Sequence, residues 1–442
     1  MKQILLKAFM LMLVAVFAIS AAADNTFTAA DGNTYKWTIN ADGTTATLTG
    51  LQNTDFSAGM NLPDRVTADH ITWYTVTEIK ENAFIGDNTN SLTLPSTLVK
   101  IGANAFTSNL YFTTITIPSS VTDIGADAFQ FCVDLKTVII NASPSLKIGD
   151  AAFDTDITGI IDIPGALESV IITSDTPPTL YNDPAYASET AYPYFSPSAK
   201  IYVPDATTGT ATTSVQYKYK HAWSSYSSRI YKFFDKPLAG PYNAYYGTLA
   251  LPYAVEIPTD RSSFNVYMVS AITKNEGLTA ATMAKILPAS ATTKAYIPAS
   301  TGVVLKSQEA YTPRFLETTE TVAPNTTNKL QPCLTDGGLA NDYTSYLTLG
   351  RDKELLAQGQ TVVGFYLYTG TTIARNTAYM LYSDAGAKKM ILSFGDDTPT
   401  AIKGVTEAAS QSRQNAVYDL QGRRVQNPQK GIYIVNGKKV LY

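Results

Sequence analysis

Few side chains in this chain have the types and spacing that catalysis or metal binding requires. Only two histidines occur, His70 in DHITWY and His221 in YKHAW, and neither lies near a Gly-flanked serine or a reactive cysteine in a recognisable motif. Metal ligands at short spacing and the glycine fingerprints of phosphate or dinucleotide sites are also missing from the sequence. Two acids can converge from distant parts of a β fold, as in glycosidases, but the sequence singles out no such pair. We therefore expect no catalysis, no cofactor and no metal, and a role in binding.

A short pattern recurs four times in the first third of the chain. It reads IKENAF (79–84), IGANAF (101–106), IGADAF (124–129) and IGDAAF (148–153), so its phenylalanines Phe84, Phe106, Phe129 and Phe153 are 22, 23 and 24 residues apart. A period of about 20–29 residues is typical of a leucine-rich solenoid. Between the copies lie short stretches with alternate apolar residues, namely LTLP (92–95), ITIP (115–118), VIIN (138–141) and IDIP (161–164). One such unit cannot bury its apolar side alone, so neighbouring units must stack into a continuous core.

The alternation within each stretch predicts which side chains face the core. The first and third residues point inward and the middle residue points outward, because successive side chains of a strand face opposite sides. We expect Ile124 and Phe129 to fill the core, Ala128 to leave room for the adjacent ring, and Gly125 to permit a sharp turn.

The outward residues form the candidate binding face, because partners of such solenoids use the broad surface of the stacked strands. The candidate residues are Thr93, Thr114, Thr116, Thr137, Ile139 and Asp162. The alternative interpretation is that threonine merely suits the open side of a strand.

Three segments resemble the repeat of the BspA-like leucine-rich repeat proteins of bacterial cell surfaces: VTEIKENAF, LTLPSTLVKIGANAF and ITIPSSVTDIGADAFQFCVDLKTVII. Flanking stretches are similar to the entry strands and the closing cap of that family, the cap through Thr176-Pro177-Pro178, IYVPDA (201–206), Trp223 and Tyr226. The resemblance covers about half of the chain. It implies a non-enzymatic protein that takes part in adhesion to host matrix proteins or to other bacteria. It also implies a core-facing thiol at Cys132, which we favour over a disulfide with Cys333.

The first 23 residues have the pattern of a secretory signal peptide. Lys2 and Lys7 precede an apolar run at 8–19, and the alanines 21–23 predict cleavage between Ala23 and Asp24. No later run approaches the roughly 18 apolar residues of a membrane helix. The chain has 33 Lys and Arg against 37 Asp and Glu. It therefore lacks the excess of basic residues that is typical of proteins that bind nucleic acids. We expect a secreted or surface-exposed protein without an integral membrane span.

Residues 236–395 carry no repeat but many short apolar runs, such as FNVYMVSAI, TVVGFYLYTG and NTAYMLYS, each bounded by turn residues. Such runs predict β-sandwich-like packing. Tyrosines are dense here and could form a carbohydrate platform, although tyrosine is also an ordinary half-buried strand residue.

The last segment, 396–442, contains a strong hairpin signal at Asn436-Gly437. Its strings VYDLQGRRV and GIYIVNGKKV resemble the C-terminal sorting domain of proteins exported by the type IX system, which implies contact with export machinery. A terminal strand pair that caps the preceding domain is the alternative.

The sequence thus predicts a mainly β protein, a leucine-rich-repeat solenoid followed by a β-sandwich-like domain and a short C-terminal β-hairpin segment. The expected domains are a signal peptide (1–23), β entry strands (24–70), repeats with their C-terminal cap (71–235), the tyrosine-rich domain (236–395) and the sorting-like segment (396–442). The expected function is binding of an extracellular protein or glycan. Alternatives are an exported carbohydrate-binding protein or hydrolase with its site in 236–395, or a passive surface spacer.

Overall fold

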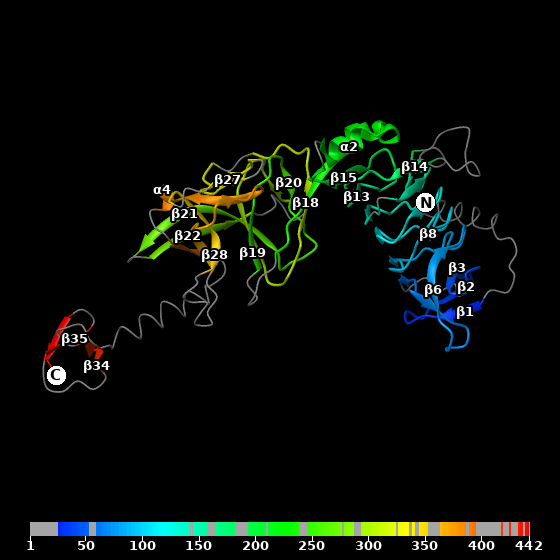
Figure 1. Cartoon of the computed structure of the whole chain (residues 1–442), viewed down its shortest axis with the longest axis horizontal. Helices are drawn as coiled ribbons and strands as arrows, with labels where there is room; N and C mark the ends of the chain where they lie inside the picture. Colours follow the sequence, from blue (N-terminus) through cyan, green and yellow to red (C-terminus); the bar gives the residue numbers. More distant parts are fainter. Residues whose placement is uncertain are drawn as a thin grey trace. The chain divides into compact units, whose positions relative to one another are not determined.

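The computed structural model describes residues 25–52, 59–141, 143, 145–156, 165–181, 193–208, 211–238, 245–275, 278–286, 293–323, 326–335, 338–340, 344–351, 363–385 and 389–394, and short strands between 417 and 441. The chain divides into two compact units, residues 1–234 and 235–442 (Figure 1). No helix in the described part is long and apolar enough to cross a membrane.

Antiparallel strands open the first unit. They are β1 (Asn25–Thr28), β2 (Thr34–Ile39), β3 (Thr45–Leu51) and β5 (Arg65–Val66). β3 then pairs in parallel with β6 (Tyr74–Ile79), the first strand that belongs to a repeat. Tyr35 and Trp37 on β2 are fully buried, so these strands close the end of the solenoid core.

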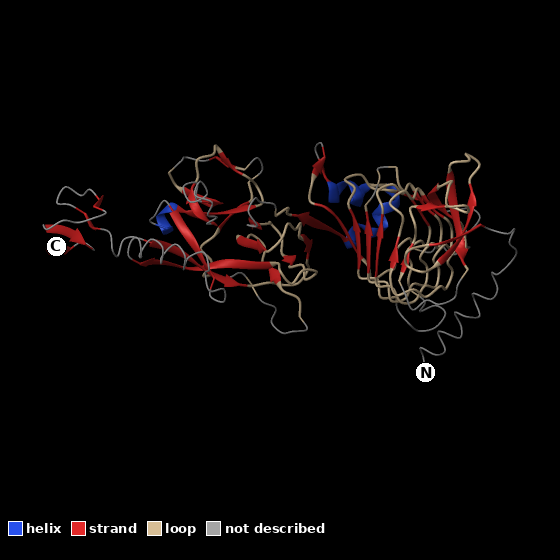
Figure 2. Cartoon of the chain, turned by 90° about the horizontal axis from the view of Figure 1, so that it is seen from below, coloured by secondary structure: helices blue, strands red, loops and turns tan. Residues whose placement is uncertain are grey.

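The repeats build two parallel sheets whose successive strands lie side by side (Figure 2). The first sheet continues from β6 through β8 (Lys100–Ile101), β10 (Asp123–Ile124), β12 (Lys147–Gly149) and β14 (Thr179–Tyr181). The second contains β9 (Thr114–Ile117), β11 (Thr137–Ile140), β13 (Ser169–Ile172), β15 (Lys200–Pro204) and β18 (Ile230–Asp235). A separate parallel pair joins β4 (Met60–Asn61) to β7 (Leu92–Thr93).

A stack of phenylalanine rings runs through the core of the solenoid. Phe84, Phe106, Phe129, Phe153 and Phe195 are fully buried, with neighbouring ring centroids 5.1–5.8 Å apart and interplanar angles of 4–12°. Trp223 and Tyr226 close the stack beside Phe195. Ile124 and Ala128 are also fully buried. The predicted core positions of the repeat are therefore confirmed.

The prediction that Gly125 permits a sharp turn is wrong. Gly125 does not have a positive φ; a Cβ at this position would instead lie 2.5 Å from the backbone nitrogen of Ala103. Glycine is required because the backbone of the preceding coil approaches closely. The left-handed position comes two residues later, at Asp127 (φ 57°), and its equivalents Asn82 and Asn104 are also left-handed. Asn and Asp tolerate this conformation better than most residues, so they make the turn.

The fourth coil differs from the expected one. The stretch IDIP (161–164) lies outside the described residues, and β11 pairs instead with β13, at residues 169–172. The cap that follows consists of β16 (Thr207–Thr208), β17 (Ala211–Thr212), the helix α2 (Thr213–Tyr219) and the 3₁₀ helix η1 (His221–Arg229). Trp223 Nε1 donates to the carbonyl of Pro178 at 2.8 Å, which joins the Thr-Pro-Pro stretch to the cap.

The second unit contains a nine-stranded sheet in which neighbours are antiparallel except for β22 and β32. Its strands, in sheet order, are β19 (Tyr245–Leu249), β24 (Val303–Ser307), β21 (Asn265–Asn275), β22 (Leu278–Lys285), β32 (Lys389–Phe394), β29 (Val363–Leu367), β28 (Tyr346–Arg351), β31 (Thr377–Leu381) and β26 (Gln331–Cys333). Val304, Phe365 and Met380 come from different parts of this order yet share one buried cluster. The sheet therefore folds over on itself, in agreement with the expected sandwich-like packing.

Smaller elements complete the second unit. β20 (Val255–Glu256) pairs with β23 (Tyr296–Ile297) and β25 (Arg314–Glu317), β27 (Leu339–Ala340) pairs with β30 (Thr372–Ile373), and α4 spans Tyr382–Ala385.

Four short strands form an antiparallel sheet near the end of the chain, namely β33 (Val417–Tyr418), β34 (Arg424–Val425), β35 (Ile432–Val435) and β36 (Lys438–Leu441). Val435 pairs with Lys438, so the strands of the predicted hairpin are confirmed. Its turn residues, Asn436 and Gly437, lie outside the described residues.

Candidate functional site

The candidate residues on β9 and β11 lie side by side on the outward face of the second sheet. Thr114 pairs with Thr137, and Thr116 pairs with Ile139. Thr114 and Thr116 are exposed, Thr137 and Ile139 are half-buried, and the alternate residues of both strands are buried. The predicted strand phase is therefore confirmed for these two strands.

Thr93 and Asp162 stand apart from this pairing. Thr93 is exposed on β7, a strand that contacts β9 but whose hydrogen-bonded partner is β4. Asp162 lies outside the described residues, and the register places Ile171, rather than Asp162, beside Ile139. We call the four threonines Thr93, Thr114, Thr116 and Thr137, together with Ile139, the threonine face.

Beyond the threonine face, the residues at the same register position of the following strands are apolar, and those on β13 and β15 are buried. Ile139 pairs with Ile171, Ile171 with Tyr202, and Tyr202 with Tyr231. Ile171 and Tyr202 are each only 5% exposed, and the two tyrosine rings lie 5.8 Å apart. Sequence reasoning missed this part of the row, although SVII (169–172) and IYVP (201–204) carry the same apolar alternation as the earlier strands. The exposed part of the row therefore coincides with the threonine face.

The threonine hydroxyls are available for contacts with another molecule. Within the described residues, the side chains of Thr93, Thr114, Thr116 and Thr137 form no hydrogen bond. Each hydroxyl can both donate and accept, and the buried strands hold all four at fixed positions. This arrangement can recognise a polar partner but cannot by itself activate a nucleophile.

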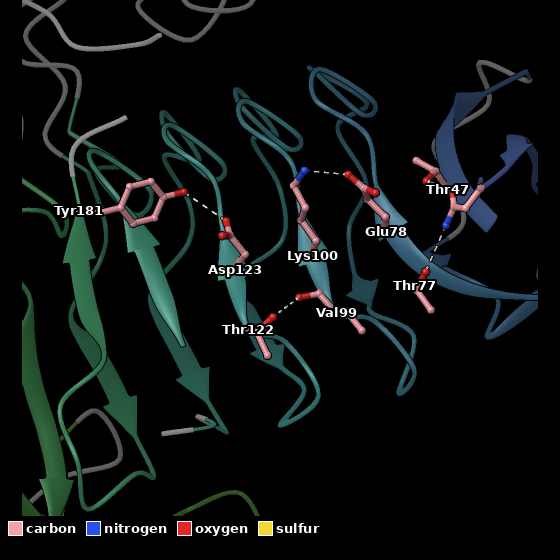
Figure 3. Close-up of polar contacts among 9 residues, drawn as sticks. Thr47, Thr77, Glu78, Val99, Lys100, Thr122, Asp123 and Tyr181 are labelled. Carbon is pink, nitrogen blue, oxygen red and sulfur yellow. Dashed lines mark hydrogen bonds and ion pairs between the residues drawn. The ribbon is translucent and has the colours of Figure 1, made fainter. Parts of the chain in front are cut away.

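On the outward face of the other solenoid sheet, some polar side chains pair with each other. Glu78, Lys100, Asp123 and Lys147 lie in register on successive strands and alternate in charge. Lys100 Nζ lies 2.9 Å from Glu78 Oε1, and this hydrogen bond is the largest cause that raises the pKa of Lys100 (Figure 3). Tyr181 donates from its hydroxyl to Asp123 Oδ1 at 3.1 Å. These two contacts link neighbouring coils on this face and use part of its polar groups internally.

The histidines and cysteines do not form a reactive centre in the described part of the chain. His70 is exposed in a loop, where its backbone N–H donates to Thr67 Oγ1 at 2.9 Å. Both cysteines are free and buried. Cys132 Sγ donates to the carbonyl of Phe106 at 3.3 Å, and burial raises the pKa of its thiol to about 12, which makes it a poor nucleophile. The prediction of a core-facing Cys132 is confirmed. Among the described residues no group of three or more His, Cys, Asp or Glu could hold a metal ion.

The tyrosines of the second unit are packed rather than displayed. Tyr346 and Tyr379 meet edge to face with ring centroids 5.1 Å apart, and both are half-buried. The aromatic side chains that are strongly exposed in the described chain, Trp73 and Tyr111, both belong to the first unit. Tyr346 and Tyr379 are thus packed as ordinary half-buried strand residues.

Comparison with known proteins identifies the repeat. Residues 69–171 match the model of the BspA type leucine-rich repeat region, in six copies. No curated protein matches the chain significantly. The matched residues, 69–171, include all residues of the threonine face.

Solved structures with similar chains are leucine-rich repeat proteins. One from Bacteroides capillosus is 25% identical, over 41% of this chain and 99% of the other, with a TM-score of 0.23. One from Bacteroides ovatus is 17% identical, over 38% and 71% of the two chains, with a TM-score of 0.16. A leucine-rich cell surface protein from Faecalibacterium prausnitzii is 14% identical, over 42% and 77%, with a TM-score of 0.13.

Proposed function

We propose that this chain, whose residues 69–171 match the BspA type leucine-rich repeat, is an exported binding protein that recognises an extracellular protein or glycan through the threonine face. The observation that supports this most directly is the set of free threonine hydroxyls on an exposed, regularly spaced strand surface. Extended surfaces of this kind are what solenoid proteins use to bind partners.

The geometry suits an elongated ligand. Neighbouring strands lie about 4.8 Å apart and present their outward residues in rows, so hydroxyl groups recur at short, regular intervals. Ile139 lies between Thr116 and the buried Ile171 in the register and offers the ligand an apolar contact. The absence of charge among these five side chains favours a ligand recognised by hydrogen bonds and shape rather than by ion pairing.

The double substitution Thr93→Lys/Thr116→Lys is expected to abolish binding while the protein stays folded. Both side chains are exposed, so the lysines remain solvated, and surface substitutions usually change the stability by less than about 0.5 kcal/mol. The measurement is binding of the chain without residues 1–23 to an array of matrix proteins and glycans. Thermal unfolding of each variant serves as the folding check.

Thr38→Lys is the matched control, because Thr38 is also exposed on a strand of the first unit but lies on β2, away from the threonine face. Binding that survives the double substitution would contradict the threonine face as the site. A complete lack of ligands in the unsubstituted chain would favour the passive spacer. Loss of stability in Thr116→Lys would show that the side chain is not exposed.

We also propose that residues 1–23 direct export and that the segment 396–442 serves as a type IX sorting domain. The support is the signal-peptide pattern, the resemblance of VYDLQGRRV and GIYIVNGKKV to such domains, and the presence of a small separate sheet, β33 to β36.

Deletion of residues 396–442 is expected to trap the protein in the periplasm of its host. The sorting domain is the part that the export machinery recognises, so the remaining chain should fold but not reach the surface. Cell fractionation with surface proteolysis measures this, and resistance of the periplasmic protein to mild proteolysis confirms folding. Surface display equal to that of the full chain would rule out the sorting role.

A further inference from the structure

Three acidic residues lie near one another where the third and fourth coils stack. Asp127 belongs to IGADAF, and Asp150 and Asp154 belong to the next coil. The backbone N–H of Asp127 donates to the carbonyl of Asp150, and that of Phe131 donates to the carbonyl of Asp154, both at 3.0 Å. Asp150 and Asp154 are buried and Asp127 is half-buried. One of the backbone hydrogen bonds that join the two coils therefore links two acidic residues, Asp127 and Asp150.

The described surroundings of Asp127 and Asp154 supply little positive charge. The groups that face them from the preceding coil, Asn104 and Thr107, are neutral, and Thr107 Oγ1 donates to the carbonyl of Asp127 at 2.6 Å. Neither Asp127 nor Asp154 forms an ion pair within the described residues.

The groups on the far side of the cluster belong to the closing cap and to Asp156. Asp156 adds a further negative charge near Asp154. Tyr194 and Tyr226 are neutral at physiological pH. Arg229 is the nearby cation, but its Nη1 donates to the carbonyls of Ser196, Pro197 and Ala199 and its guanidinium lies 4.8 Å from the Tyr226 ring. Its hydrogen bonds are therefore directed at the cap and not at the carboxylates.

Burial and mutual repulsion favour the protonated carboxyl groups in the folded chain. Burial, followed by the charges of Asp150 and Asp154, raises the pKa of Asp127 from 3.8 to about 7. Burial is likewise the first cause that raises the pKa of Asp154 to about 6. The unfolded chain has the ordinary value, so between about pH 4 and pH 7 the folded chain binds more protons. Stability is therefore highest at acidic pH and falls as the pH rises through this window.

The repeat itself supplies the neutral counterpart of Asp127. The equivalent positions of the two preceding coils carry Asn82 and Asn104, in the same left-handed conformation. Their backbone N–H groups donate to the next coil in the same way, Asn82 to Ala103 and Asn104 to Ala126. Asparagine thus meets every conformational need of the site, and aspartate adds only the ability to take up a proton.

We propose that the contact between the third and fourth coils is a pH-sensitive joint, tightened by proton uptake at Asp127 and Asp154 and loosened at neutral pH. This device is independent of the threonine face as a binding site. It gives the solenoid its greatest rigidity in mildly acidic surroundings, on the coils that present Thr116 and Ile139.

The test is thermal unfolding of the full chain at pH 5.5 and pH 7.5, together with hydrogen exchange of peptides that contain Asp127 and Phe131. The first unit is expected to melt about 2–5 °C higher at pH 5.5, and the two amides to be better protected after correction for intrinsic rates. Asp127→Asn is expected to raise the melting temperature at pH 7.5 and to shrink the difference between the two pH values. The matched control is Asp134→Asn, which removes the same charge from an exposed position and should leave the difference unchanged.

A second variant distinguishes the pH dependence of this contact from that of another buried carboxyl group. Burial also raises the pKa of Asp87 to about 7, and Asp87 lies at the position that Asn109 occupies in the next coil. Asp87→Asn should therefore alter the global pH dependence but leave the pH dependence of exchange at Asp127 and Phe131 intact. The proposal is overturned if the wild-type first unit is not more stable at pH 5.5. It is equally overturned if Asp127→Asn keeps the full pH dependence of exchange.

Discussion

Replacement of Phe129 by alanine is expected to lower the free energy of unfolding of the first unit by about 3–5 kcal/mol. The ring is fully buried and lies between Phe106 and Phe153, with centroid distances of 5.1 and 5.2 Å. Its removal takes away contacts on both faces and leaves a cavity. The coils cannot close over this cavity, because hydrogen bonds such as that from Phe129 N–H to the carbonyl of Ala152, at 2.8 Å, hold them at a fixed separation.

Urea unfolding followed by circular dichroism measures this effect. Tyr111→Ala is the control, because Tyr111 is an aromatic residue of the same unit that is 37% exposed and leaves no closed cavity. If Phe129→Ala lowered the free energy of unfolding as little as the control does, the ring stack would not be a main source of the stability of the core.

The substitution Gly125→Ala is expected to cost about 1–3 kcal/mol, the usual range for overpacking a tight site. A Cβ at this position would lie 2.5 Å from the nitrogen and 2.8 Å from the Cα of Ala103. These are backbone atoms of the preceding coil, so relief requires the coils to move apart rather than a side chain to rotate. The strained contact would also weaken the hydrogen bond from Gly125 N–H to the carbonyl of Ile101, now 2.8 Å.

Gly350→Ala provides the matched control for this substitution. Its Cβ would meet only a side-chain atom of Tyr366, at 3.4 Å, and its φ lies in the ordinary range. The control should change the melting temperature little, whereas Gly125→Ala should lower that of the first unit by several degrees. Equal effects of the two substitutions would argue against a close backbone approach at Gly125.

The regular part of the fold could be predicted from the sequence because each coil repeats the same local rules. Phe129 and Ile124 recur at fixed positions, and alternation within ITIP (115–118) was enough to place Thr116 outside and its neighbours inside. The identity of Gly125, by contrast, did not reveal its role. A glycine can serve a turn or a close contact, and only the position of Ala103 in the preceding coil distinguishes the two.

The candidate site was predictable only where the coils kept a constant length. The register beyond Ile139 depends on a longer connection, so Ile171 takes the place that IDIP (161–164) suggested for Asp162. The charged ladder from Glu78 to Lys147 was not foreseen either. The strands that bear Lys100, Asp123 and Lys147 are two or three residues long, too short to show a period, and the members of the ladder become neighbours only through stacking.

The ring stack has a consequence for how such a chain can change. The sequence spacing between successive phenylalanines, from Phe84 through Phe106 and Phe129 to Phe153, grows from 22 to 23 to 24 residues. The centroids of neighbouring rings nevertheless stay 5.1–5.4 Å apart. Added residues are therefore accommodated in the connecting segments and not in the core. A coil could be lengthened, or a whole coil duplicated, without displacing the strands that bear the outward threonines. The length of the recognition surface can thus change in steps of one coil while the chemistry of each step is conserved.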